Sequence, residues 1–256
     1  MTLLESGQQL AGDIALWLQA LDDPAMPLAE MGRLSLELGE GLRGLAIIAL
    51  LAKGDVNKFH HNLIRSARCR LAFLERVHRE GELAQHDFVA GCAEPLLDAI
   101  AADDLDDARR IADLVPPAFR PGHEYEDDFW FAQLLHRLVD GPGGTPAALD
   151  ACTRLRALGG SAARARADAG EAIAGTDPVA FGVAFEAVLA ERELRLREEE
   201  ARGELESPAV LARRKVDIEA LAWLRLAQRA GLPADADYRF CPALARRPMT
   251  EPLLDD

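Results

Sequence analysis

The chain has 256 residues, of which 49% are apolar and 28% are charged, so it can bury a substantial core and is too apolar for a disordered protein. Its 29 basic and 43 acidic residues leave a formal net charge of −14. This charge disfavours binding to nucleic acid or to an anionic membrane surface, because both are negative themselves. A basic protein partner is a better electrostatic match.

The cysteines and the N-terminus bear on the compartment. The four cysteines are widely spaced and form no C-x-x-C pair, which argues against a disulfide framework and against a cysteine-rich zinc site. Residues 1–13 lack the basic segment of a secretion signal, and the longest apolar stretch, residues 45–52, is too short to span a bilayer. We therefore expect a cytoplasmic protein.

Helical periodicity runs through nearly the whole chain, whereas strand signals are almost absent. The first helices are predicted over residues 8–21, 28–52 and 56–80, and four glycines leave open whether the second is one helix or two. From residue 85 onward, units of helix, turn and helix follow one another, separated by proline and glycine breakers. Their predicted helices span residues 85–101, 105–115, 124–139, 145–158, 161–174, 177–202 and 207–230.

This pattern predicts an all-α fold, an irregular array of antiparallel helical hairpins of the solenoid or bundle kind, with little or no β-structure. No linker is long enough to divide the chain. We expect a single domain over residues 1–256, in which residues 85–245 form the array of hairpins and residues 246–256 form a loose C-terminal tail.

Two glycine motifs resemble nucleotide-binding loops. The run Gly39-x-Gly41-x-x-Gly44 matches the dinucleotide fingerprint, but no βαβ unit can be built around it, so we interpret it as a place of close helix packing. The run Gly141-Pro-Gly-Gly lacks the lysine of a phosphate loop and is interpreted as a turn. The six histidines show no spacing that binds a metal. We predict no cofactor, no metal site and no catalytic residues.

A basic stripe lies on the helix predicted over residues 56–80, opposite its apolar stripe. Over residues 58–79 it includes Lys58, Arg65, Arg68, Arg70, Arg76 and Arg79. Two interpretations stay open. The arginines either form ion pairs with acidic segments of the same chain, for which arginine is well suited, or bind an acidic ligand. A second charged segment, residues 191–206, has the alternating charges of a solvated, salt-bridged helix face.

An acidic stretch between residues 98 and 128 is the counterpart of the basic stripe, with ten acids and three arginines. Some of these acids begin helices, where they cap free N–H groups. The alternative is a patch that docks a basic partner. Calcium binding is a further option, although no EF-hand loop is present. The predicted partner-binding residues are Asp103, Asp104, Asp106, Asp107, Glu124, Glu126, Asp127 and Asp128.

Two runs in the last third of the chain resemble the immunity 49 family of bacterial polymorphic-toxin systems. The first covers residues 177–189, an Asp-Pro turn that leads into an apolar helix. The second covers residues 218–244, a closing helix with a Gly-Leu-Pro stop and a tail that contains Tyr238. An aromatic helix that begins at Phe129 is also similar. The resemblance covers about 100 residues, mostly packing residues, and brings no catalytic residue with it.

The resemblance implies an immunity protein that binds one cognate toxin stoichiometrically and covers its active site. With the acidic stretch, it predicts a toxin domain with a basic surface as the partner, and neither nucleic acid nor membrane. Two alternatives stay open. One is a helical-repeat scaffold or adaptor that binds a peptide in a groove. The other is an enzyme whose residues converge only in the fold. The sequence leaves the oligomeric state open.

Overall fold

The computed structural model describes residues 2–21, 23–141, 145–203, 212–234 and 237–253. This part of the chain contains no β-strand, and its regular structure is helical apart from two isolated β-bridges. The all-α prediction is confirmed. The helices are α1 (Leu3–Leu21), α2 (Leu28–Lys53), α3 (Val56–Glu80), α4 (Glu94–Ala101), α5 (Leu105–Leu114), α6 (Glu126–Val139), α7 (Thr145–Leu158), α8 (Ser161–Gly175), α9 (Pro178–Ala201), α11 (Ile218–Arg229) and the 3₁₀ helix η2 (Ala243–Arg246).

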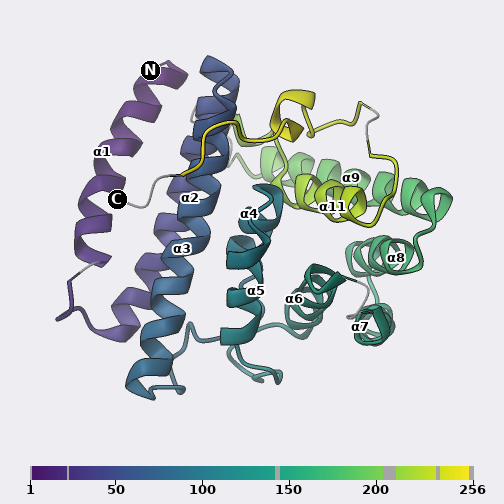
Figure 1. Ribbon diagram of the computed structural model, residues 1–256, viewed down its shortest axis with the longest axis horizontal. Helices are drawn as coiled ribbons and strands as arrows, with labels where there is room; N and C mark the ends of the chain where they lie inside the picture. Colours follow the sequence, from purple (N-terminus) through teal and green to yellow (C-terminus); the bar gives the residue numbers. More distant parts are fainter. Residues whose placement is uncertain (1, 22, 142–144, 204–211, 235–236, 254–256) are drawn as a thin grey trace.

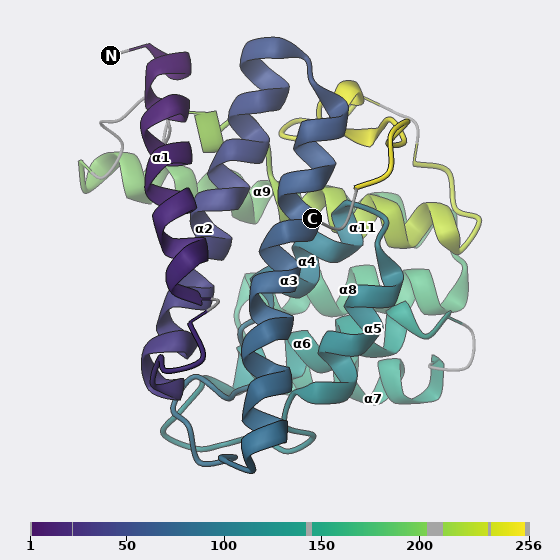
Figure 2. The ribbon, with the colours of Figure 1, turned by 60° about the vertical axis from the view of Figure 1, so that its left-hand side comes forward.

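Helices α1, α2 and α3 stand side by side as a row of long helices (Figures 1 and 2). Helices α4 and α5 pack against α3. Beyond α4 and α5, on the side away from the row of long helices, α6, α7, α8 and α9 follow as successive antiparallel neighbours. Helix α11 closes the arrangement by packing on both α4 and α9. The buried apolar residues form one continuous cluster that extends from Ile14 to Ala245.

The glycine-rich segment forms one continuous helix, α2, and the three glycines of the nucleotide-like motif face neighbouring helices. A Cβ atom on Gly39 would lie 3.0 Å from the Ser66 hydroxyl oxygen, and one on Gly41 would lie 3.1 Å from Ile14. The glycines thus allow α2 to approach α1 and α3 closely, as the packing interpretation predicts.

The helix predicted over residues 85–101 begins only at Glu94, and residues 81–93 are irregular. Two arginine side chains explain the difference. The buried guanidinium of Arg70 donates to the carbonyl oxygens of Asp87 and Val89, at 2.7 and 3.2 Å. Arg120 donates to the carbonyl oxygens of Gln85 and Phe88. These contacts satisfy backbone acceptors that a helix would otherwise have to pair.

The helix predicted over residues 207–230 is interrupted at residues 214–217, and α11 begins at Ile218. Asp217 precedes it in an extended conformation and caps it, since its carboxylate accepts from the Ala220 N–H at 3.2 Å. The Asp217 N–H donates to the Phe240 carbonyl at 2.9 Å. The predicted start at residues 207–208 lies outside the described residues.

The C-terminal segment, which we expect to be loose, lies against α3. The Asn57 side chain accepts from the Thr250 N–H at 2.9 Å, and His60 and His61 contact the carbonyl oxygens of Arg247 and Glu251 at 2.8 and 2.9 Å. Met249 and Leu253 pack against the core. The chain is therefore held against α3 over residues 247–251.

Candidate functional site

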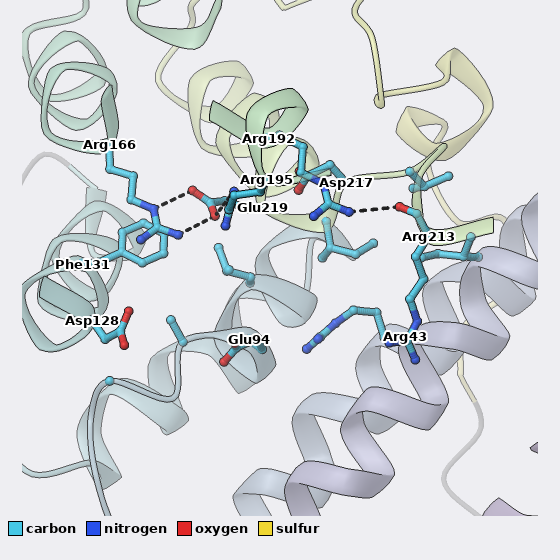
Figure 3. Close-up of a pocket in the computed structure, with 16 residues that line it drawn as sticks. Arg43, Glu94, Asp128, Phe131, Arg166, Arg192, Arg195, Arg213, Asp217 and Glu219 are labelled. Carbon is cyan, nitrogen blue, oxygen red and sulfur yellow. Dashed lines mark hydrogen bonds and ion pairs between the residues drawn. The ribbon is translucent and has the colours of Figure 1, made fainter. Parts of the chain in front are cut away.

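A cavity of about 270 Å³ opens between α2, α4, α6, α8, α9 and the start of α11. Charged side chains from all of these elements reach it (Figure 3). Its walls hold five arginines and four carboxylates, which are Arg43, Arg166, Arg192, Arg195, Arg213, Glu94, Asp128, Asp217 and Glu219. We refer to it as the arginine pocket.

The first turn of α11 places two carboxylates in the arginine pocket. The Arg166 guanidinium makes a two-pronged contact with Glu219 at 2.8 and 2.7 Å, and it stacks 3.9 Å from the centre of the Phe131 ring. Arg192 Nε lies 3.0 Å from Asp217. These contacts explain why α8 and α9 both turn arginines toward α11.

The pKa values of the two carboxyl groups are shifted in opposite directions. Burial acts to raise the pKa of Glu219, but the charge and hydrogen bonds of Arg166 outweigh it and leave that pKa lowered. Burial and the neighbouring charge of Glu219 raise the pKa of Asp217, and Arg192 offsets this only in part. Glu219 is therefore held firmly as an anion, whereas Asp217 carries its charge at a cost.

On the opposite wall, Arg43 is anchored by Asp98, which is fully buried at 0% exposure. Arg43 donates to both carboxylate oxygens at 2.7 and 2.8 Å, and the Ser66 hydroxyl donates to Asp98 at 2.5 Å. This cluster joins α2, α3 and α4. Arg213 pairs with Glu40 on the same side at 2.6 Å.

Carboxylates gather at one side of the arginine pocket, where α4 and α6 begin. Gly91 donates its N–H to Glu124 at 2.6 Å, and a Cβ atom there would lie 3.1 Å from Asp128. Burial, followed by the charges of Asp127, Glu94 and Glu124, raises the pKa of Asp128, which Arg166 only partly offsets. We call Glu94, Glu124, Asp127 and Asp128 the mouth carboxylates.

The structure separates the predicted partner-binding residues into two groups. Glu124, Asp127 and Asp128 are mouth carboxylates, and Glu126 lies beside them on the first turn of α6. The other group, Asp103 to Asp107, lies at the turn between α4 and α5, where Asp103 pairs with Arg229 at 2.8 Å. Asp128 faces Arg166 near the start of α11, whereas Asp103 pairs with Arg229 at its end, so the two groups lie toward opposite ends of α11.

The group at the α4–α5 turn is largely engaged within the chain. Asp107 is buried and contacts Arg68 at 3.0 Å and Arg110 at 2.7 Å. Asp104 caps α5 by accepting from the Asp107 N–H at 3.2 Å. Asp106 is the exposed member of this group, because 93% of its side chain is accessible to solvent.

The basic stripe on α3 likewise makes contacts within the chain. Arg68 pairs with Asp107 of the acidic stretch, and Arg70 binds backbone carbonyls. Arg76 pairs with Glu80 at 2.6 Å and donates to the Pro24 carbonyl at 3.1 Å. These contacts favour the internal ion-pair interpretation of the stripe over a ligand site.

Sequence reasoning misses the arginine pocket. The pattern of residues 191–206 predicts a solvated face, yet Arg192 and Arg195 line the pocket. The one signal in the sequence is Asp217, a capping type of residue directly before an apolar helix. Among the described residues, no group of three or more His, Cys, Asp or Glu side chains is placed to hold a metal ion. No helix in the same part of the chain is long and apolar enough to cross a membrane.

Comparison of the chain with protein-family models, with curated proteins and with solved structures found no match in any of the three. The resemblance to the immunity 49 family therefore stays a prediction from the two runs that carry it.

Proposed function

We propose that this protein is an immunity protein that neutralises one cognate bacterial toxin in the cytoplasm by binding it stoichiometrically and covering its active site. The observation that supports it best is the group of mouth carboxylates. Glu94 and Asp127 are exposed, and the three acids around Asp128 all raise its pKa. The similarity of residues 177–189 and 218–244 to the immunity 49 family gives the class of partner.

Repulsion among the mouth carboxylates is a cost that the free protein bears and that a basic partner would relieve. Arg166 offsets part of this repulsion, but its guanidinium already binds Glu219. A lysine or arginine placed among these acids would gain attraction from several charges at once. Long-range attraction from a chain with a net charge of −14 would also speed the encounter.

The proposed contact surface is narrower than the predicted set of eight acids. It keeps Glu124, Glu126, Asp127 and Asp128, and it gains Glu94. The four acids at the α4–α5 turn leave the proposed interface. Asp104 and Asp107 hold the start of α5, and Asp103 and Asp106 pair with Arg229 and Arg109 of the same chain.

The test uses the toxin domain encoded in the adjacent reading frame. Charge reversal of Glu126 and Asp127 to Lys together is expected to raise the dissociation constant about 10- to 100-fold, because exposed rim charges contribute modestly one by one. The matched control is the Asp13→Lys variant, which makes the same kind of change at an exposed site on α1. Failure of the wild-type chain to bind or inhibit the toxin would refute the proposal. A complex of unchanged affinity would remove only this acidic contact surface from it.

A second candidate function is a scaffold that binds a peptide, and a second cavity favours it. This cavity of about 430 Å³ lies where α5, α6, α8 and α11 meet, and Leu138, Ile173 and Leu226 contribute to its lining. An Ile173→Trp variant would fill it. Loss of peptide capture in that variant, with toxin binding intact, would favour the scaffold over the toxin inhibitor.

A further inference from the structure

Four of the five arginines in the arginine pocket each have a carboxylate partner within the chain. The pairs are Arg43 with Asp98, Arg166 with Glu219, Arg192 with Asp217 and Arg213 with Glu40. Because opposite charges cancel within each pair, these arginines leave little positive charge for a ligand. The groups outside the pairs decide what the arginine pocket can bind.

Arg195 is the arginine without a carboxylate of its own. Its Nη2 lies 3.7 Å from Glu219, which is beyond hydrogen-bond distance, and Arg166 already contacts that carboxylate at two points. The Nε of Arg195 is buried and has no hydrogen-bond partner among the described residues. The α9 wall of the arginine pocket therefore carries one positive charge that the chain satisfies only in part.

Two carboxylates of the arginine pocket are also left without a partner. Glu94, on the first turn of α4, and Asp128, on the first turn of α6, make no hydrogen bond or ion pair within the described part of the chain. Arg43 and Arg166 act on them only at longer range. The helix dipoles favour negative charge at both positions, but no N–H or O–H group donates to either side chain.

These unpaired groups lie on different walls of the cavity. Figure 3 shows Arg195 on one side of the arginine pocket and Glu94 and Asp128 on the other. Arg195 belongs to α9, which packs on α8 and α11, whereas the two acids lie where α4 and α6 begin. The cavity thus separates one unpaired positive charge from two unpaired negative charges.

We propose that the arginine pocket binds a free basic α-amino acid, such as arginine or lysine. The α-carboxylate accepts from the Arg195 guanidinium, and the α-ammonium and the side-chain cation lie against Glu94 and Asp128. Such a ligand carries one negative and two positive charges, which complement the unpaired groups. The cavity of about 270 Å³ lies just below the range of about 300–1,000 Å³ for drug-sized ligands, so it suits a molecule of this small size.

Neither a simple anion nor a simple cation satisfies both walls. Inorganic phosphate would find only Arg195 unpaired and would be repelled by Glu94 and Asp128. A diamine would pair with the two acids and leave Arg195 as it is. A basic α-amino acid supplies a partner to each wall, and its cations offset the repulsion that helps to raise the pKa of Asp128.

The inference goes beyond the proposed inhibitor role and does not depend on it, because the purified full chain alone tests it. In calorimetric titrations at matched ionic strength, arginine and lysine are expected to bind at one site per chain. Agmatine, which is arginine without its carboxylate, and citrulline, whose side chain is neutral, are each expected to bind at least about tenfold more weakly than arginine. Phosphate is expected not to bind.

Two variants assign the walls. Arg195→Gln is expected to raise the dissociation constant of arginine about tenfold and to leave that of agmatine within about threefold, since agmatine has no carboxylate to lose a contact. Glu94→Gln is expected to weaken the binding of both about tenfold, because both bring a cation to that wall. Arg197→Gln is the matched control on the same helix, since the Arg197 side chain is 71% exposed and lies outside the arginine pocket.

Three results would each overturn the proposal. The first is that neither arginine nor lysine binds at concentrations up to about 10 mM. The second is that agmatine binds as tightly as arginine. The third is that Arg195→Gln weakens the binding of arginine and agmatine equally, which would show that Arg195 does not contact the α-carboxylate.

Discussion

Helices α3 and α9 are nearly equal in length, with 25 and 24 residues, and each begins with a capping aspartate, yet their outer sides differ. The polar side of α3 is engaged with its own chain, through Arg68 to Asp107, Arg76 to the Pro24 carbonyl and His78 to the Leu114 carbonyl. The outer side of α9 carries the exposed apolar residues Val179, Val183 and Leu194.

This contrast shows how far amphipathic periodicity can be interpreted. On α3, the apolar stripe is the side that packs into the core, and the polar side contacts partners inside the same chain. On α9, one apolar stripe accounts for the core contact, and the second has no role in a single chain. The following variants test whether α3 is an internal element and α9 an external one.

Loss of the Asp98 carboxylate is expected to have the largest effect, because it holds α3 to α2 and α4. Asp98→Ala leaves Arg43 without its partner and Ser66 without its acceptor, and breaking a buried pair in this way costs about 3–5 kcal/mol. Urea denaturation measures the change. The control is Asp106→Ala, whose side chain is 93% exposed and which should stay within about 0.5 kcal/mol of the wild type. A similar small loss for Asp98→Ala would refute the anchoring role.

A smaller loss is expected where α2 meets α3. A Cβ atom on Gly32 would lie 2.8 Å from Asp87 Oδ2 and 3.0 Å from the Phe73 ring, and Phe73 is fully buried. Gly32→Ala should therefore cost about 1–3 kcal/mol through overpacking, despite the better helix propensity of alanine. Thermal and urea unfolding measure it. Gly12→Ala on α1 is the control, since its added Cβ meets nothing within 4 Å and should not destabilise.

The packing of α3 was predictable because its pattern is local. The predicted range, residues 56–80, coincides with the observed helix, and the stop at Gly81 is a left-handed glycine cap. Residues 85–93 were not predictable in this way. Their backbone is held by Arg70 and Arg120, and a contact between distant residues leaves no periodic trace.

The candidate site was predictable only in part, for the same reason. The acidic stretch indicated Asp128 and its neighbours, which do lie beside the arginine pocket. The pocket itself depends on Arg166 of α8 meeting Glu219 of α11, and on Arg192 of α9 meeting Asp217. Each of these residues alone is typical of a solvent-exposed helix. Only the folded structure shows that they contact one another.

Acid should weaken α3 through His60, which is buried beside the C-terminal segment. Burial lowers the pKa of His60, although its hydrogen bond to the Arg247 carbonyl acts in the opposite direction, and Arg225, Asp103 and His61 lie nearby. The unfolded chain then binds a proton near pH 6.5 that the folded chain resists. The stability from neutral His60 is present above that pH and is lost as pH falls below it.

The expected slope from His60 is at most about 1.4 kcal/mol per pH unit, that of a single proton. His60→Gln keeps a donor for the Arg247 carbonyl without a titrating ring. Its free energy of unfolding should fall less steeply than that of the wild type between about pH 6.5 and pH 5. Equal slopes in urea titrations at matched ionic strength would show that His60 contributes nothing.

The smallest effect is expected on α9 and has the opposite sign. A Cβ atom added to Gly182 in this helix would meet nothing within 4 Å, so the new methyl group enters open space. Gly182→Ala should stabilise the chain by about 0.5–1 kcal/mol, because alanine restricts the unfolded state and favours helix. A loss of stability, measured by thermal unfolding, would mean that another part of the chain covers Gly182, and the contrast with α3 would be weakened.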